Sequence, residues 1–245
     1  MNKGLFEASE EGTPQGGPLS PLLSNIMLNE LDKELERRGL PFVRYADDSM
    51  IFCKSKRAAM RVKESITRFV ENALYLKVNK EKTVGSYVRG VKYLGYSFYV
   101  MKGKCQLTVH PKSKAKMKSK LKELTSRSNG WGYAKRKHKQ KEYIRGWIGY
   151  YHLVNMKRLL LETDEWLRRR IRMCIWKAWK KVKTRVANLI RCGISKYKAY
   201  EWGNTRKGYW RIADSYILHR AITNEHLCRA GYATLIGTYL EWHPK

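Results

Sequence analysis

Acidic residues are scarce in this 245-residue chain, and the shortage is uneven. The chain has 51 Lys and Arg against 21 Asp and Glu, a net charge of +30 with a pI near 10.0. Residues 101–245 hold only 9 acidic residues beside 35 basic ones, whereas residues 1–100 hold 12 beside 16. The resulting +26 in the second part exceeds the magnitude of about 2–8 that keeps a small domain soluble. This charge indicates a polyanionic partner, with a solvated basic face or a membrane-surface protein as alternatives.

Cysteine, metal-ligand spacing and long apolar runs are also lacking. The five cysteines are scattered without any Cys-x-x-Cys pair, and the six histidines show no ligand spacing, which argues against zinc and a disulfide framework. No apolar run approaches the roughly 20 residues of a membrane-spanning helix. The start, where Lys3 is followed by Glu7 and Glu10, does not read as a signal peptide. We expect a reduced, cytoplasmic protein without a membrane partner.

Aromatic residues are plentiful, and their placement follows the charge. They make up 12% of the chain, and all eight tryptophans lie within residues 101–245. The hydrophobic fraction of 43% is globular, and the length suffices for one large or two modest domains. Because cations neutralise phosphates and aromatic rings stack on bases, the second part reads as a nucleic-acid-binding module beside a near-neutral body.

Helices and strands alternate in the first part. We expect a helix from Ser20, with Ser20 as its N-cap and Pro21 at the first helical position. Its apolar residues at four-residue spacing predict a buried stripe of Leu23, Met27, Leu31 and Leu35. A second helix is expected from 55 to 74, and a strand at 76–79.

A hairpin of residues 91–100 and 106–109 is expected next, which makes the fold class α+β. From Pro111 onward the pattern becomes helical, with a break at Asn129-Gly130. Residues 164–183 form the clearest helix of this part. One face of that helix is apolar, and the other carries the basic residues Arg168, Arg169, Arg172 and Lys180.

Two adjacent carboxylates, Asp47 and Asp48, stand in the sequence Tyr-Ala-Asp-Asp at 45–48. Apolar and β-branched residues flank them on both sides, which predicts two strands joined at this point. Adjacent anions repel unless a cation joins them, and Mg²⁺ takes one or two carboxylates together with phosphates. A solvated turn is the alternative, since Asp is a preferred turn residue.

Three segments in this order resemble the palm of a reverse transcriptase. They are residues 11–23, with Pro-Gln-Gly-Gly at 14–17, residues 45–48, and residues 93–98, Tyr-Leu-Gly-Tyr-Ser-Phe. More narrowly, they resemble a group II intron-encoded reverse transcriptase and maturase. The Tyr-Ile-Arg-Gly-Trp-Ile-Gly-Tyr-Tyr run at 143–151 and the Arg- and Trp-rich run at 166–180 are similar to the maturase, or thumb, domain of that family.

The resemblance implies two domains. Residues 1–105 would be the second half of a reverse-transcriptase palm, with antiparallel strands and helices, and without the fingers or the first palm motif. Residues 106–245 would be an all-α maturase and thumb domain that binds RNA.

The resemblance also assigns roles to individual residues. Asp47 and Asp48 would be catalytic and would bind Mg²⁺, and Tyr45 would lie near the primer terminus. The remaining assignments are Gln15 and Gly16 for the incoming nucleotide and its template base, Lys82 for the nucleotide phosphates, and Leu94, Gly95 and Tyr96 for the primer grip.

The alternatives to these roles are structural. Lys82 could be a solvated charge, Leu94 could belong to the sheet core, and Trp147 and Trp166 could be core residues. For RNA contact, the basic cluster of Arg168, Arg169 and Arg172 is the stronger candidate.

The implied reaction is Mg²⁺-dependent, RNA-directed DNA synthesis from dNTPs on an RNA template with a DNA primer, and the implied partner is group II intron RNA. The family uses a third palm aspartate upstream, but no Asp precedes Pro14. A non-catalytic splicing cofactor is therefore the first rival. A different reverse transcriptase class, such as a retron enzyme, is the second, and the run at 143–151 with the long basic extension argues against it.

Overall fold

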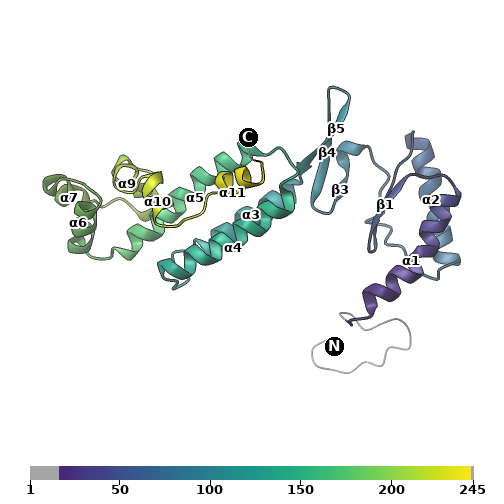
Figure 1. Cartoon of the computed structure of the whole chain (residues 1–245), viewed down its shortest axis with the longest axis horizontal. Coiled ribbons are helices and arrows are strands. Elements are labelled where there is room, and N and C mark those ends of the chain that lie inside the picture. The colour runs from purple at the N-terminus through teal and green to yellow at the C-terminus, as the bar shows by residue number, and fades with distance from the viewer. Residues whose placement is uncertain (1–16, 244–245) are drawn as a thin grey trace. The chain divides into compact units, whose positions relative to one another are not determined.

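Two compact units make up the chain, and the division falls between Tyr93 and Leu94 (Figure 1). The computed structural model describes residues 17–243. Helices and antiparallel strands share the first unit, and helices dominate the second, so the α+β prediction is confirmed. Among the described residues, no helix is long and apolar enough to cross a membrane.

The first unit is built on two helices and a short hairpin. Its elements are α1 (Ser20–Arg37), β1 (Phe42–Tyr45), β2 (Asp48–Ile51), α2 (Lys56–Asn72), a 3₁₀ turn (Val88–Gly90) and β3 (Lys92–Tyr93). Strands β1 and β2 pair antiparallel, with Tyr45 opposite Asp48. The small core joins the two helices and contains Leu31, Leu35, Ile66, Val70 and Leu74.

Helix α1 begins at Ser20 as predicted, but Ser20 is not its cap. Leu19 occupies the cap position, and no side chain caps the helix. The predicted buried stripe holds only in its second half: Leu31 and Leu35 are buried, whereas Leu23 and Met27 are 46% and 45% exposed. Periodicity marked the apolar face correctly, but the other elements of this unit cover only its C-terminal half.

Helix α2 is confirmed, and Ser55 caps it by accepting a hydrogen bond from the Ala58 amide at 3.2 Å. The strand predicted at 76–79 is wrong, because these residues form no ladder. Leu76 and Val78 instead pack against the small core as irregular chain. Their apolar character reflects burial, which a strand and a packed loop share.

The second unit opens with a hairpin and continues as helices. Strands β4 (Tyr96–Met101) and β5 (Lys104–Val109) pair antiparallel, with Phe98 opposite Leu107. The helices are α3 (Pro111–Leu124), α4 (Tyr133–Tyr151), α5 (Lys157–Ala178), α6 (Val182–Arg191), α7 (Lys196–Gly203), α8 (Tyr209–Ile212), α9 (Tyr216–Ala221), α10 (Asn224–Arg229) and α11 (Leu235–Trp242).

The hairpin prediction is confirmed, although its first strand is shorter than expected. Leu94 and Gly95 interrupt the run 91–100, because both adopt positive φ, 48° and 82°. Helix α5 includes residues 164–178 of the predicted helix 164–183. It begins earlier than predicted, at Lys157, and ends earlier, at Ala178. A boundary between 105 and 106 would lie inside strand β5, and it stays a prediction.

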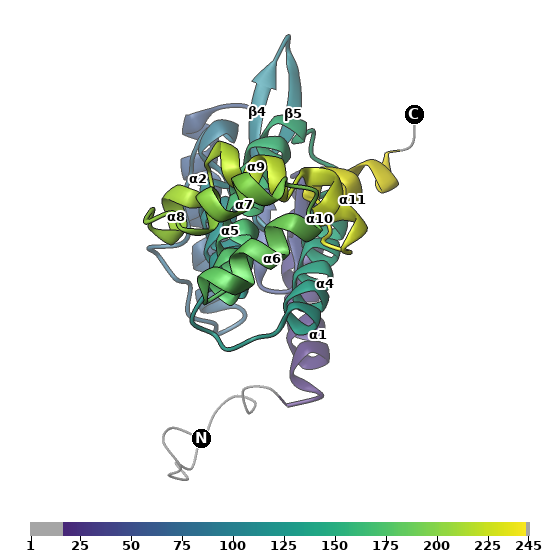
Figure 2. The ribbon, with the colours of Figure 1, turned by 90° about the vertical axis from the view of Figure 1, so that its left-hand side faces the viewer.

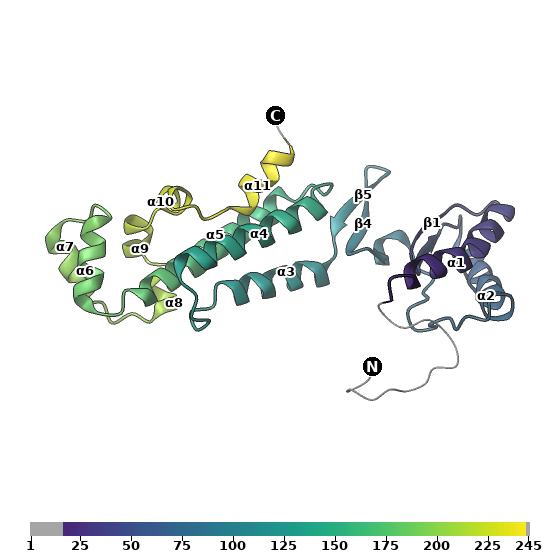
Figure 3. The same cartoon turned by 60° about the horizontal axis from the view of Figure 1, so that its bottom comes forward.

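The core of the second unit lies among α3, α4, α5 and α11, and Figure 3 shows α3, α4 and α5 running alongside one another. Met117, Leu121, Ile144, Ile148 and Leu160 are fully buried there. Helices α6 and α7 pack together (Figure 2) beyond the C-terminal end of α5 (Figure 1), and α8 packs against α5. In α3 and α4 the buried residues recur four positions apart, and this spacing puts one face of each helix into the core.

Candidate catalytic and nucleic-acid-binding residues

Asp47 and Asp48 lie where strands β1 and β2 meet. Ala46 and Asp47 form the turn, and Asp48 is the first residue of β2. Ala46 reaches the turn through a positive φ of 52°, a conformation that costs an L-residue energy and needs support from its surroundings. Both Asp47 and Asp48 are exposed, so the hairpin presents two consecutive acidic residues to solvent at its tip.

Arg44 supplies that support from strand β1. Its Nε and Nη2 donate to the Asp32 carboxylate at 2.8 and 2.6 Å, and its Nη1 donates to the Ala46 carbonyl at 3.0 Å. The hydrogen bond to Asp32 raises the pKa of Arg44, so the clamp stays charged. Tyr93 adds a long contact of 3.5 Å from its hydroxyl to the Asp48 carbonyl.

The ion pair between Arg44 and Asp32 was not predicted from the sequence. The feature that could have indicated it is an arginine within an otherwise apolar strand, because a partly buried arginine needs an acidic partner. Asp32, twelve residues upstream on α1, gives no sign of being that partner until the fold is known.

The carboxylate pair suits a hard cation. No ion pair among the described residues engages Asp47 or Asp48, so their oxygens remain available. Mg²⁺ is held by one or two carboxylates, with waters and substrate phosphates filling the other positions. Within residues 17–243 no group of three or more His, Cys, Asp or Glu side chains gathers to hold a metal. The pair therefore fits part of a divalent-cation site.

The other residues predicted for the palm are dispersed. Tyr45 is 65% exposed at the end of β1, beside the turn. Lys82 is exposed in a turn, where its backbone amide donates to Asn79 Oδ1 at 3.1 Å, and no described contact links it to the carboxylate pair. Gln15 and Gly16 lie outside the described residues.

Leu94 and Gly95 form a tight turn before Tyr96, the first residue of β4, and helices of the second unit hold this turn. The Tyr150 hydroxyl donates to the Leu94 carbonyl at 2.8 Å, and the Tyr96 hydroxyl donates to the Tyr150 carbonyl. The Ser113 hydroxyl donates to the Gly95 carbonyl at 3.0 Å. The turn is thus a rigid feature fixed from α3 and α4.

The three arginines predicted to contact RNA differ sharply from one another. Arg168 is partly exposed, and Arg169 is partly exposed, pairs with Asp214 at 2.8 Å and lies over the Trp210 ring at 3.9 Å. Arg172 is only 4% exposed and donates to the Ile222 carbonyl and Asn224 Oδ1 at 2.8 and 2.9 Å. The RNA-contact prediction is therefore corrected for Arg172, which ties α5 to the segment before α10.

Helices α3 and α4 carry a denser exposed cationic surface than α5 does. Lysines at every second position of α3 are mostly exposed because only Met117, Leu121 and Leu124 turn inward. The exposed basic residues of the two helices are Lys112, Lys116, Lys118, Lys120, Lys122, Lys135, Lys139, Lys141 and Arg145. We define this set as the α3–α4 cationic surface. The prediction singled out α5 and gave no weight to these residues as RNA contacts.

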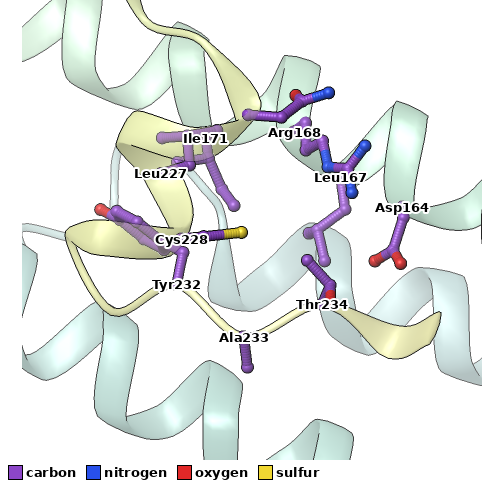
Figure 4. Close-up of a pocket in the computed structure, with 10 residues that line it drawn as sticks. Asp164, Leu167, Arg168, Ile171, Leu227, Cys228, Tyr232, Ala233 and Thr234 are labelled. Atoms are coloured by element: carbon purple, nitrogen blue, oxygen red, sulfur yellow. The ribbon is translucent and has the colours of Figure 1, made fainter. Parts of the chain in front are cut away.

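A narrow cavity of about 10 Å³ lies between α5 and the α10–α11 segment, with Arg168 at its edge (Figure 4). It is too small for a ligand larger than water. Beside it, buried Asp164 accepts hydrogen bonds from the Leu235 and Ile236 amides at 2.8 and 2.9 Å and so caps α11 from another helix. Burial raises the pKa of Asp164, although these amide bonds oppose the shift.

Comparisons with known proteins match two successive parts of the chain. The reverse transcriptase (RNA-dependent DNA polymerase) family matches residues 2–98, and the group II intron maturase-specific domain matches residues 114–193.

Curated relatives match smaller portions. Protein YkfC of Escherichia coli strain K12 is 34% identical over 131 residues, covering 39% of this chain and 34% of the relative. The group II intron-encoded protein LtrA of Lactococcus lactis subsp. cremoris is 27% identical over 160 residues, covering 39% of this chain and 27% of the relative. The retron Ec86 reverse transcriptase of Escherichia coli is 31% identical over 74 residues, covering 29% and 23%.

The chain thus spans about a third or less of the length of the relatives it matches. In this chain a maturase-specific match follows the reverse transcriptase match. With both domains matched in order and an intron-encoded relative among the similar proteins, the chain belongs to the group II intron-encoded reverse transcriptase and maturase family.

Proposed function

We propose that this chain binds group II intron RNA through its second unit and acts as a splicing maturase. The observation that carries the proposal is the concentration of charge: the +26 excess of residues 101–245 coincides with the maturase-specific match. Exposed lysines and arginines on α3 and α4 neutralise phosphates, and the tryptophans and tyrosines of the same unit offer faces to unpaired bases.

Salt dependence tests this proposal. Each phosphate neutralised by a cation contributes a slope of about −0.7 to −0.9 to the plot of log affinity against log salt. Filter binding of the 245-residue polypeptide to a group II intron RNA across a salt series should give a steep slope, reflecting several phosphate contacts. A slope near zero, or binding no tighter than that of a neutral protein of similar size, would refute it.

The first unit is proposed to carry the palm carboxylates of an RNA-directed DNA polymerase. Bound Mg²⁺ would supply charge stabilisation to a phosphoryl transfer from dNTPs. Asp47 and Asp48 would hold it, and the Arg44 clamp keeps their turn in one geometry. Tyr45 would face the primer terminus, and Lys82, Gln15 and Gly16 would serve the incoming nucleotide. Residues 94–96 would grip a DNA primer on its RNA template.

A non-catalytic splicing cofactor is the second candidate, and one observation favours it. Within the described residues no third carboxylate joins Asp47 and Asp48. With an incomplete donor set, metal would be held loosely, and primer extension should be slow or undetectable.

Primer extension on an RNA template separates the two candidates. If the chain is a non-catalytic splicing cofactor, the 245-residue polypeptide should make little cDNA. The Asp47→Ala variant should then bind RNA as wild type does. Robust Mg²⁺-dependent synthesis that Asp47→Ala abolishes would instead establish the polymerase for this chain.

A further inference from the structure

An open groove of about 510 Å³ lies between α3 and α4, and the roles above leave it unused. Trp131, Tyr143 and Trp147 line it with partly exposed aromatic surface. Gly146 also lines the groove, and a Cβ added there would meet no atom within 4 Å. The open volume of the groove gives a planar ring access to the aromatic side chains.

The segment between α3 and α4, which carries Trp131, is held in place before any ligand arrives. Arg170 donates to the Thr125 hydroxyl at 2.7 Å, and Lys177 donates to the Arg127 carbonyl at 2.6 Å. Buried Arg136 donates to Asn129 Oδ1 at 3.1 Å, and the same oxygen accepts from the Trp131 amide at 3.2 Å. Because the walls of the groove are already ordered, binding a ligand there should cost little conformational entropy.

The rim of the groove is nearly neutral, although the helices around it are basic. Lys120 pairs with Glu123 at 2.8 Å, and Lys139 pairs with Glu142 at 2.9 Å. Beyond the rim, the other members of the α3–α4 cationic surface remain exposed. A neutral aromatic groove inside a cationic field suits a ligand with an uncharged flat ring attached to an anionic backbone.

Single-stranded nucleic acid has that chemistry. Bases stack on tryptophan and tyrosine faces, while flanking phosphates meet lysines. We propose that the groove takes one unpaired base of a bound RNA, with the neighbouring phosphates on the α3–α4 cationic surface. The inference rests on the proposed RNA-binding function and places one base-stacking site within it. A protein segment in the groove is the competing occupant.

Gly146→Leu tests the groove directly, since it adds a bulky side chain to the lining at a position where a Cβ meets no atom within 4 Å, and leucine favours helix more than glycine does. The control is Ala115→Leu, which adds a leucine at an exposed position of α3 outside the groove. Two probes are compared: a single-stranded RNA with 2-aminopurine at one position, and a blunt RNA duplex without unpaired bases.

Gly146→Leu should weaken binding of the single-stranded RNA about fivefold or more, the loss expected for one stacked base. It should also remove the 2-aminopurine quenching that base stacking should produce in wild type, while duplex affinity and both salt slopes stay unchanged. Trp131→Ala should behave alike, which keeps the test decisive if Gly146→Leu fails to fold. Ala115→Leu should match wild type.

Wild-type affinity for single-stranded RNA in Gly146→Leu and Trp131→Ala, or an equal loss on the duplex, would overturn the inference. A protein occupant would give that same unchanged affinity. If wild type still binds RNA with a steep salt slope, only the groove assignment fails. If wild type binds neither RNA with salt-dependent affinity, the proposed function fails and the groove inference with it.

Discussion

Single residues set the geometry of both candidate palm features. Arg44 spans the turn of β1 and β2 from its anchor on Asp32, and Gly95 lets Tyr151 and Ser113 close over the turn at residues 94–95. The motifs at 45–48 and 93–98 pointed to these turns, but the residues that hold them come from β1, α1, α3 and α4. Such partners are fixed by packing, which a linear motif does not encode.

At Gly95, a methyl group would collide with the Tyr151 hydroxyl and lie 3.2 Å from Ser113 Oγ, at a φ of +82°. Gly95→Ala should therefore lower the free energy of unfolding by about 2 kcal/mol or more, combining backbone strain with overpacking. Gly103→Ala is the matched control, because its φ is +74° but no atom lies within 4 Å. Urea unfolding should show the larger loss at Gly95, and equal losses would exclude the steric contribution.

At the scale of elements, the start of α11 shows how a helix satisfies its free amides. Helix α11 is capped twice at its start, by the hydroxyl of Thr234 within its own segment and by the Asp164 carboxylate from α5. The second cap joins segments seventy residues apart in the sequence. It therefore stabilises the position of α11 against α5 as well as the helix itself.

Asp164→Ala should cost about 1–3 kcal/mol of unfolding free energy, because it leaves two α11 amides without an acceptor. Glu165→Ala, at the exposed neighbouring position, should cost much less. Thermal or urea unfolding of the two variants measures the difference. Equal stability of the two would show that water replaces the carboxylate at α11.

The same residue predicts a pH dependence. Burial raises the pKa of folded Asp164 above its unfolded value near 4, so the folded state binds the proton more tightly. The contribution of Asp164 to stability is then full below the unfolded pKa and falls as pH rises through the folded pKa. The stability gap between wild type and Asp164→Ala should narrow as pH rises from about 4, and a widening gap would mean that the amide bonds outweigh burial.

Elements with strong periodicity were predictable, and those defined by tertiary partners were not. Met117, Leu121 and Leu124 marked the buried face of α3, and residues 45–48 marked the hairpin turn. The prediction of a strand at 76–79 is wrong because these apolar residues pack without forming a ladder. The prediction that Arg172 contacts RNA is wrong because α5 is surrounded on more sides than its amphipathic pattern implied, and this arginine donates to a buried backbone carbonyl.

At the scale of the whole molecule, the distribution of charge along the sequence predicted the two-part organisation more directly than any motif did. Two units, one near-neutral and one strongly basic, follow from counting charges along the sequence, and the structure separates them at Tyr93–Leu94. The count could not say which cations reach solvent. The structure shifts the emphasis from α5 to the α3–α4 cationic surface, because Arg172 is engaged by a backbone carbonyl and Arg169 by Asp214 and Trp210.

The most direct test of RNA binding by the second unit compares two sets of lysine substitutions. One variant changes four exposed α3 lysines to glutamine: Lys112, Lys116, Lys118 and Lys122. The matched control changes four exposed lysines of the first unit: Lys54, Lys56, Lys77 and Lys80. Both lose equal charge. In a filter-binding salt series with group II intron RNA, the α3 variant should bind more weakly, with a slope flattened by up to about 3. The control should keep a slope close to wild type, and equal flattening in both variants, or in neither, would contradict the account.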